Sequence, residues 1–556
     1  MTPVLPHHDG SELYVSNEAP KLGEKIELRI RVPHAFARSS GLSTVLVRMY
    51  VDGEPRTFEL RKSRKSNSVE AWWSVKVVVA NPEMKYRFLL VGPKSYHWLT
   101  AAGLVTSNPT SNTDFRITAR PAFPKWLRGA VFYQIFPDRF ASSGKKRELP
   151  SWAIPRQWDL LPHGEGKTTS VEYYGGDFSG IESRIDHITK LGATGIYFTP
   201  FFPARSIHRY DASSFDFVDP LLGGDKEFIS FSQKAHKLGL KILGDLTTNH
   251  TGAGHPWLLK GLKDKSSKEH GYYYFDKKIK HGYVGWWGLA SLPKLNFNSL
   301  SLRKAFYEGE NSIVRKWLRA PKLMDGWRID VGNMTGRFKD QDMQRDVMRG
   351  IRRAMDETNP NAWLVAENGD WQTEDLDGFG WHGTMNYEGF MRPLWAWLGT
   401  GEKIGRGFHG LPIDPPTFTA QQFIESANAI KAAIPWRSLM ASMTLLDSHD
   451  TARFRTVVGK KFDRHIAGMA LLMTYPGVPS IFAGDEIGLE GAWGEDARRS
   501  MPWENTDTWD HDFFNETRAL ISIRKNSHAI ANGGLRYICI EDDYFAFLRE
   551  SSREST

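Results

Sequence analysis

The sequence contains a single cysteine, Cys539, in 556 residues. One thiol cannot form an intramolecular disulfide, and it excludes a metal cluster held by several thiolates. This fits a reducing compartment, so we expect a cytoplasmic protein. The sequence also lacks an apolar run of the ~18 residues that a membrane span needs, and its start lacks the pattern of a secretory signal. We therefore expect no membrane partner.

Clustered charge is scarce as well. The formal net charge is +8, but the basic residues are scattered, and the densest short groups are Arg61–Lys65, Lys145–Arg147 and Lys260–Lys268. Solvated loops explain these groups better than nucleic-acid contacts, because no nucleic-acid recognition motif accompanies them. Aromatic residues are abundant, with 20 Trp, 18 Tyr and 32 Phe. They suit both a large core and platforms for sugar rings, and composition does not choose between the two.

The N-terminal part of the chain has the pattern of a β domain. Between residues 20 and 118, short apolar alternations such as 27–32 and 46–51 are separated by turn signals, including Asp52-Gly53 and Asn81-Pro82. The segment Arg120–Pro124 has the composition of a linker. Residues 1–122 are therefore predicted to form a β-sandwich.

Downstream, short apolar segments alternate with longer helical ones, which predicts an α/β fold, a (β/α)8 TIM barrel. The expected strands are 130–136, 194–200, 241–246, 326–331, 363–367, 383–386, 442–447 and 480–483. The expected helices are 177–191, 225–238, 302–319, 341–357, 420–434 and 461–474. The barrel is assigned to 123–250 and 299–512, with an inserted domain after strand 3 at 251–298. Residues 513–556 are predicted to form a terminal helix and a short C-terminal β unit.

Polar residues interrupt the apolar runs at the ends of four expected strands, where a barrel of this kind carries its active site. These residues are Asp245, Asn249 and His250; Arg328, Asp330 and Asn333; Glu367 and Asn368; and Asp447, His449 and Asp450. Each alone is explained equally well by helix capping or solvation, but four strand ends together favour a site. Cleavage of a glycoside needs one ionised carboxylate and one protonated carboxylic acid. Arg328 is expected to lower the pKa of Asp330, and a third carboxylate near Glu367 to help hold its proton.

Several strings resemble those of the alpha-amylase family (glycoside hydrolase family 13), within the group of cyclomaltodextrinases, neopullulanases and maltogenic amylases. They are Asp245-Leu-Thr-Thr-Asn-His250, Gly326-Trp-Arg-Ile-Asp330, Ala366-Glu-Asn368, Leu445-Leu-Asp-Ser-His-Asp450, Leu292-Pro-Lys-Leu-Asn296, Val131-Phe-Tyr-Gln-Ile-Phe-Pro-Asp-Arg-Phe140, Tyr174-Gly-Gly-Asp177 and His208-Arg-Tyr-Asp211. The resemblance covers about residues 125 to 530. The N-terminal β domain is similar to an extra domain of that group, which often forms a dimer contact.

The resemblance assigns a role to each matching residue. It implies that Asp330 is the nucleophile, Glu367 the acid/base and Asp450 a third carboxylate that binds sugar hydroxyls. It also implies that Tyr210 stacks under the sugar ring being cleaved. The residues expected to bind substrate are Tyr210, His250, Arg328, His449, Asn333, Met334 and Asn368, while Asp245 and Asn249 are expected to be structural. The implied reaction is double displacement with retention of the α configuration.

The sequence departs from the family pattern in two places. The loop Ala141–Glu148 carries lysines where relatives have a calcium sequence, so we expect no cofactor there; calcium at the inserted domain, through Asn249, stays open. The pairs Asn333-Met334 and Asn368-Gly369, followed by Asp370, differ from relatives on the acceptor side.

These features predict a hydrolase of small cyclic or short linear maltooligosaccharides, mainly at α-1,4 bonds, acting as a homodimer through the N-terminal domain. Three alternatives remain: a hydrolase specific for a mixed α-1,4/α-1,6 ring such as cyclic maltosyl-maltose, a transglycosylase, and a non-catalytic carbohydrate-binding homologue. A transglycosylase would give longer or branched products. A non-catalytic homologue would have lost residues of the carboxylate triad, and all three are present here.

Overall fold

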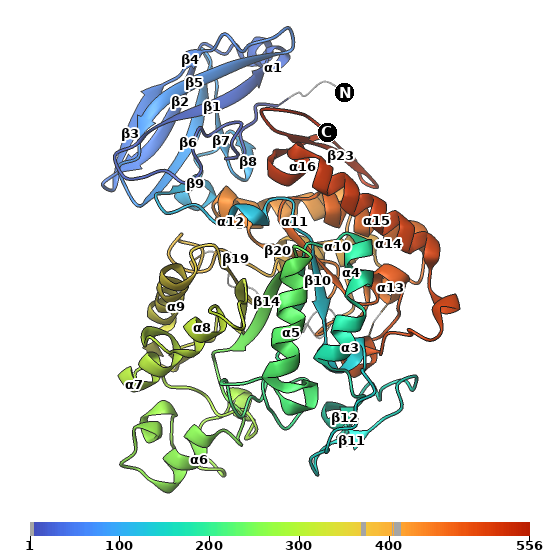
Figure 1. The fold of residues 1–556 in the computed structure, drawn as a ribbon. Coiled ribbons are helices and arrows are strands. Elements are labelled where there is room, and N and C mark those ends of the chain that lie inside the picture. Colours follow the sequence, from blue (N-terminus) through green and yellow to red (C-terminus); the bar gives the residue numbers. More distant parts are fainter. Residues whose placement is uncertain (1–4, 369–373, 403, 405–412) are drawn as a thin grey trace.

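A closed barrel of eight parallel strands forms the centre of the protein (Figure 1). The computed structural model describes residues 5–368, 374–402, 404 and 413–556. In sequence order the barrel strands are β10 (Phe132–Ile135), β13 (Gly195–Phe198), β14 (Lys241–Thr247), β15 (Gly326–Asp330), β18 (Trp363–Ala366), β19 (Gly383–Thr384), β20 (Met443–Leu445) and β21 (Val478–Phe482). A parallel bridge between Met385 and Met443 closes β19 against β20. All eight strands lie where the sequence predicted them, which confirms the TIM-barrel fold.

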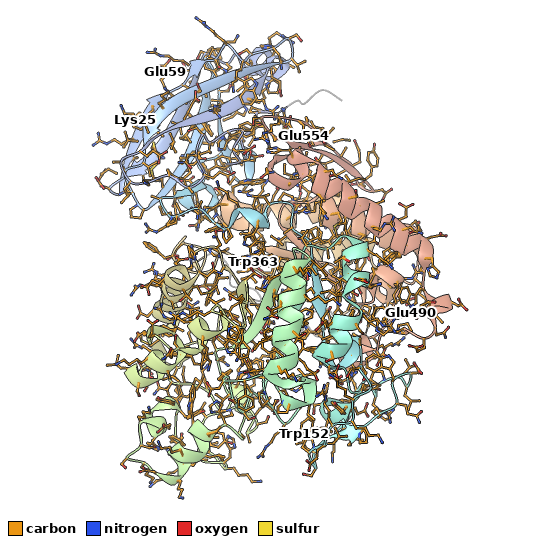
Figure 2. All side chains as sticks on the ribbon, viewed as in Figure 1. Lys25, Glu59, Trp152, Trp363, Glu490 and Glu554 are labelled. Atoms are coloured by element: carbon orange, nitrogen blue, oxygen red, sulfur yellow. The ribbon has the colours of Figure 1, made fainter. Side chains whose placement is uncertain are left out.

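The barrel strands are short and mostly buried on both faces. Every residue of β10, β13, β15, β18 and β21 is buried. Continuous apolar runs of this kind are typical of parallel sheets covered by helices. Trp363 of β18 has no exposed surface and is labelled near the middle of the molecule in Figure 2.

Helices surround the barrel. They are α2 (Pro137–Phe140), α3 (Phe178–Ser183), α4 (Ile185–Leu191), α5 (Gly224–Lys237), α7 (Leu300–Arg303), α8 (Ile313–Trp317), α9 (Gln344–Thr358), α10 (Arg392–Leu398), α11 (Ala420–Ala433), α12 (Trp436–Met440), α13 (Phe454–Val457) and α14 (Phe462–Thr474). The predicted helix 177–191 is interrupted at Arg184, which leaves the helical region (φ −104°, ψ 11°). The predicted helix 302–319 is interrupted at Gly309, whose backbone is extended (φ −69°, ψ 153°). Glycine has a low helix propensity, which favours the second break.

The N-terminal part consists of two antiparallel sheets with a common core, as predicted for a β-sandwich. One sheet has the order β1-β5-β4, and the other has the order β3-β2-β6-β7-β8 with β9 beside β6. The elements are β1 (Lys25–Pro33), α1 (His34–Ser40), β2 (Thr44–Val51), β3 (Glu54–Glu59), β4 (Arg61–Lys62), β5 (Glu70–Val78), β6 (Glu83–Val91), β7 (Tyr96–Thr100), β8 (Gly103–Val105) and β9 (Phe115–Thr118). Leu28, Val47 and Phe88 belong to one buried apolar cluster that spans both sheets.

The remaining elements lie outside the barrel and the sandwich in Figure 1. The segment between β14 and β15 includes α6 (Pro256–Lys263), and the short strands β11 (Ile154–Pro155) and β12 (Glu172–Tyr173) follow β10. These segments lie at the end opposite the sandwich (Figure 1). The C-terminal part has α15 (His511–Asn526), α16 (His528–Asn532), β22 (Gly534–Ile540) and β23 (Phe545–Glu550). Within the described ranges, no helix combines the length and apolar character needed to cross a membrane.

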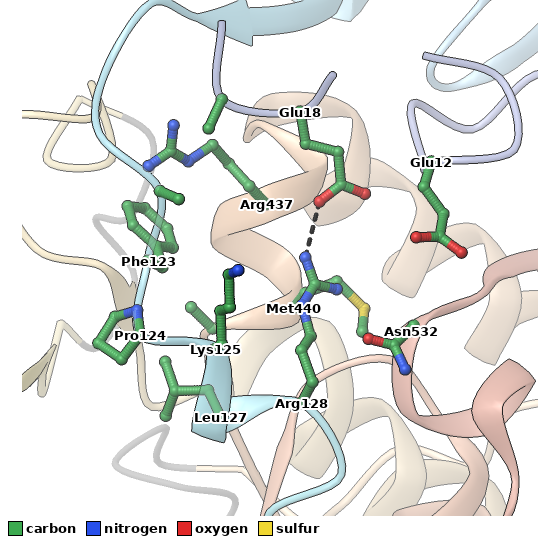
Figure 3. A pocket seen from close by; sticks show the side chains of 13 residues that line it. Glu12, Glu18, Phe123, Pro124, Lys125, Leu127, Arg128, Arg437, Met440 and Asn532 are labelled. Carbon is green, nitrogen blue, oxygen red and sulfur yellow. Dashed lines mark hydrogen bonds and ion pairs between the residues drawn. The ribbon is translucent and has the colours of Figure 1, made fainter. Parts of the chain in front are cut away.

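Charged contacts join the sandwich to the rest of the protein. Arg31 of β1 bonds to Glu550 of β23 (Nη1 to Oε1, 3.0 Å), and Glu70 of β5 pairs with Arg536 of β22. Arg128, in the linker that enters the barrel, pairs with Glu18 at 2.7 Å beside a cavity of about 310 Å³ (Figure 3). The sandwich is thereby attached to the end of the barrel away from α6.

Candidate active site

Three carboxylates from neighbouring strands surround one arginine at the carboxyl ends of the strands. Nη1 of Arg328 lies 2.9 Å from Oδ1 of Asp330 and 2.9 Å from Oδ2 of Asp245, and its Nη2 lies 2.9 Å from Oε2 of Glu367. The register pairs Asp245 with Arg328 and Thr247 with Asp330. The strand alignment therefore brings together the groups that the sequence placed at separate strand ends.

The three proposed catalytic acids are more exposed than Arg328 and Asp245. The side chains of Asp330, Glu367 and Asp450 are 9%, 23% and 38% exposed, whereas those of Arg328 and Asp245 are fully buried. The three acids can thus meet a substrate, while the arginine and Asp245 lie beneath them. This fits the structural role that the sequence suggested for Asp245.

A strained residue holds Glu367 in place. Val331 follows Asp330 and has φ 39°, a left-handed conformation that β-branched residues rarely adopt. In this conformation its backbone N–H donates to Oε2 of Glu367 at 3.0 Å. Strain of this kind is concentrated at functional sites, where the surrounding structure maintains it.

The electrostatics of Asp330 differ from the sequence prediction. Burial raises the pKa of Asp330 well above its usual value; Arg328 opposes this rise, and the carboxylates of Glu367, Asp245 and Asp450 add to it. Arg328 was expected to lower the pKa, but its single charge is shared among three carboxylates. Burial and the neighbouring acids therefore oppose ionisation of Asp330, and the contact with Arg328 favours it.

Asp450 lies in a different environment from Asp330. Burial opposes its ionisation, but His449 and Arg498 outweigh burial and hold the pKa of Asp450 below its usual value. Nε2 of His449 lies 3.0 Å from Oδ2 of Asp450, and Nη2 of Arg498 lies 3.2 Å from Oδ1. Asp450 is thus suited to remain an anion while a neighbouring carboxyl keeps a proton.

Tyr210 and His449 form a stacked pair connected to Asp245. Their ring centroids are 5.6 Å apart and their planes differ by 11°. The Tyr210 hydroxyl donates to Oδ2 of Asp245 at 3.0 Å and lies 2.5 Å from Nε2 of His449. The side-chain amide nitrogen of Gln134 lies 2.6 Å from Nδ1 of His449 and holds the ring from its other side. Tyr210 is partly exposed, as a ring that stacks on a sugar must be.

His250 and Met334 both contact Trp286 of the inserted segment. The ring of His250 stacks on Trp286 at 5.1 Å, and Nε1 of Trp286 donates to Sδ of Met334 at 3.1 Å. Burial and the charge of Lys294 lower the pKa of His250 to about 3, so its imidazole is neutral at physiological pH. His250, like Arg328 and His449, has no exposed surface, so direct contact with a sugar stays a prediction for these three.

The two places where relatives could suggest calcium already carry cationic side chains. The ammonium group of Lys294 donates to Oδ1 of Asn249 and to the backbone carbonyl of Met334 (3.2 Å). In the loop 141–148, Arg147 pairs with Asp177 at 2.7 Å and Lys145 with Glu227 at 3.0 Å. Ammonium and guanidinium groups repel a cation, so these contacts oppose Ca²⁺ at both places.

The remaining acceptor-side residues have separate surroundings. Asn333 is partly exposed, and its carbonyl accepts from Nη1 of Arg337 at 2.7 Å. Asn368 is fully buried and its amide donates to Asp375 at 2.5 Å, so its contact with a sugar also stays a prediction. Gly369 and Asp370 lie outside the described residues.

Three contributors were missed in the sequence: Gln134, Trp286 and Arg498. Gln134 contacts His449, which is 315 residues away in the sequence, and Arg498 contacts Asp450, which is 48 residues away. Local sequence patterns do not predict contacts over such separations. Trp286 stands in Gly285-Trp-Trp-Gly288, and two consecutive tryptophans between glycines are a signal that could have indicated a surface aromatic site.

The chain is similar to known proteins in sequence. The family model for the catalytic domain of alpha-amylase matches residues 134–529. A cyclomaltodextrinase from a Bacillus species is 27% identical over 87% of this chain and 83% of its own length. An amylopullulanase of Thermoanaerobacter thermohydrosulfuricus is 29% identical over 96% of this chain. The chain spans only 32% to 46% of the amylopullulanases that it matches.

Solved structures show the same likeness. A cyclomaltodextrinase has a TM-score of 0.73 and 25% identity, covering 99% of this chain and 90% of its own. The cyclic α-maltosyl-(1→6)-maltose hydrolase of Arthrobacter globiformis, in complex with that ring, has a TM-score of 0.67 and 27% identity. That match covers 78% of this chain and 91% of the other.

Proposed function

The chain belongs to the alpha-amylase family, and from that premise we propose that it is a retaining hydrolase of α-glucosidic bonds, mainly α-1,4, in small cyclic or short linear maltooligosaccharides. The observation that carries the proposal is the Arg328 cluster, in which one guanidinium contacts Asp330, Glu367 and Asp245. Within it, the side chains of Asp330 and Glu367 keep 9% and 23% exposure at one rim of the barrel.

In the proposed reaction, the ionised carboxylate of Asp330 attacks the anomeric carbon. Glu367 donates its proton to the glycosidic oxygen as the bond to the leaving sugar breaks, which leaves a covalent glycosyl-enzyme. Glu367, now ionised, then takes a proton from water, and that water displaces Asp330 from the anomeric carbon. Two inversions give overall retention. Asp450, held as an anion by His449 and Arg498, binds hydroxyls of the ring.

The test is a product profile from purified enzyme with cyclodextrin, maltohexaose, soluble starch and pullulan, with proton NMR of the first product. We expect preferential hydrolysis of the cyclodextrin and maltohexaose, with an α-anomer released first. A β-anomer would contradict the retaining mechanism. Complete inactivity on all four, from a folded protein, would contradict the hydrolase assignment.

A second candidate is a hydrolase specific for a mixed α-1,4/α-1,6 ring such as cyclic maltosyl-maltose. It is favoured by the likeness to the Arthrobacter globiformis enzyme and by Met334, which contacts Trp286 beside the site. Adding this ring to the same profile separates the candidates. Faster cleavage of the mixed ring than of cyclodextrins supports the second, and brisk cyclodextrin cleavage without turnover of the ring excludes it.

We also propose a cytoplasmic homodimer that contacts through the N-terminal sandwich and needs no calcium. Partly exposed apolar side chains on the sandwich, Phe58, Val78 and Tyr96, support the contact. Light scattering is expected to give twice the chain mass, and Val78→Asp to give the monomer mass. Cell fractionation tests the location.

A further inference from the structure

Trp286 and Trp287 form a stacked pair that extends outward from the site. Their ring centroids are 4.7 Å apart with an interplanar angle of 22°. Trp286 also stacks on His250, at 5.1 Å and 11°, and its indole N–H is anchored on Sδ of Met334. A row of aromatic rings therefore runs from His250 to the surface.

The row begins beside the catalytic cluster. His250 comes three residues after Thr247, the register partner of Asp330, and Met334 comes four residues after Asp330. The inserted segment is tied to this region, because Lys294 contacts both Asn249 and the Met334 carbonyl. The tryptophan pair is thus continuous with the proposed active site.

The backbone conformation of Trp287 keeps its ring exposed to solvent. Trp287 is 78% exposed and has φ 50° and ψ 26°, a left-handed conformation that is rare outside glycine. Backbone hydrogen bonds fix the turn on both sides: Gly288 N–H to the Gly285 carbonyl (3.0 Å) and Leu289 N–H to the Trp286 carbonyl (2.9 Å). Apart from its stacking on Trp286, this indole buries little surface, so a constrained backbone that keeps it exposed points to a binding role.

We propose that Trp287 is a binding platform for a glucose unit of an α-glucan chain, at a position beyond the ring being cleaved. One face of a glucopyranose ring is lined by C–H groups, which pack well on an indole face. The chain would lie across the tryptophan pair while one of its bonds reaches Asp330. This inference rests on the proposed function, because it assigns the same class of substrate.

The test measures binding separately from turnover. In an Asp330→Asn background, calorimetry with maltoheptaose should show that Trp287→Ala weakens binding about fivefold. Maltotriose, which is too short to span the cleavage point and the platform, should bind with less than about a twofold change. Trp287→Phe should recover part of the loss. Leu289→Ala is the matched control, since this neighbouring apolar side chain is 47% exposed and lies outside the stack.

Kinetics supply the second measurement. With Asp330 intact, Trp287→Ala should raise KM for maltoheptaose and leave kcat and maltotriose hydrolysis unchanged. Unaltered maltoheptaose binding in Trp287→Ala would overturn the platform, as would an equal loss in Leu289→Ala or an equal loss with maltotriose. If the wild type hydrolyses no α-glucan but binds maltoheptaose through Trp287, the proposed function fails and the platform stands. If the wild type hydrolyses α-glucans and Trp287→Ala has no effect, the platform fails and the proposed function stands.

Discussion

Arg328 and Asp330 stand two residues apart on β15, and Nη1 of the guanidinium lies 2.9 Å from Oδ1 of the carboxylate. The same guanidinium also contacts Asp245 and Glu367. Arg328 is therefore a counterion shared by three carboxylates, and it connects three strand ends. Because its charge is divided, burial determines the direction in which the pKa of Asp330 moves.

This arrangement predicts the acid side of the pH profile. Asp330 must be ionised to attack, and burial raises its pKa, so activity falls as the pH drops through that raised value. The acid limb of kcat/KM should lie above ~3.9, the ordinary pKa of an aspartic acid. Arg328→Lys keeps a charge but loses the planar, two-pronged guanidinium, so it should move the acid limb upward. Arg319→Lys, at the exposed pair with Glu310, is the control; an unmoved limb in Arg328→Lys would refute the shared-counterion account.

Asp330→Asn is expected to lower kcat by several orders of magnitude, because an amide cannot form the covalent intermediate. Circular dichroism should confirm that the variant is folded. Asp342→Asn, an exposed acid nearby, should keep full activity. Activity of Asp330→Asn within tenfold of the wild type would rule out Asp330 as nucleophile.

Tyr210 offers a way to separate ring stacking from hydrogen bonding. Tyr210→Phe keeps the ring but loses the bonds to Asp245 and His449, so kcat/KM should fall about tenfold. Tyr210→Ala also removes the ring that stacks on the sugar, so its kcat/KM should fall about 100-fold. Thermal melting should show that both variants remain folded. If Tyr210→Ala unfolds while Tyr210→Phe is fully active, the ring serves core packing instead.

Calcium chelation should have no effect on this protein. Lys294 occupies Oδ1 of Asn249, and basic side chains already pair with Asp177 and Glu227. Excess EDTA is therefore expected to leave both Tm and kcat unchanged, and added Ca²⁺ should not raise Tm. A drop in Tm on chelation that Ca²⁺ restores would show a calcium site that these contacts do not account for.

Much of the fold could be predicted from the sequence because the barrel strands are local apolar runs that end in polar residues. The convergence of Asp330, Glu367 and Asp245 followed from strand ends meeting at one rim. The pKa of Asp330 could not be predicted, since it depends on how many acids share Arg328. Contacts such as Trp286 with His250, or Arg498 with Asp450, join separate segments and emerge only from packing. The break at Gly309 shows that helical periodicity alone does not fix continuity.

The junction between the sandwich and the C-terminal hairpin yields a stability prediction. Glu70 lies between two buried guanidiniums, Arg31 (3.5 Å) and Arg536, and is itself 5% exposed. Glu70→Ala would leave Arg536 without this partner and weaken the compensation of Arg31, which still has Glu550. Breaking a buried pair in this way costs about 3 kcal/mol, so Tm should fall by several degrees. The control is Glu27→Ala, which breaks the more exposed pair of Glu27 with Arg29. It should lower the free energy of unfolding by only about 0.5 kcal/mol. Melting curves that are equal for the two variants would mean that the Glu70 network adds no net stability to the junction.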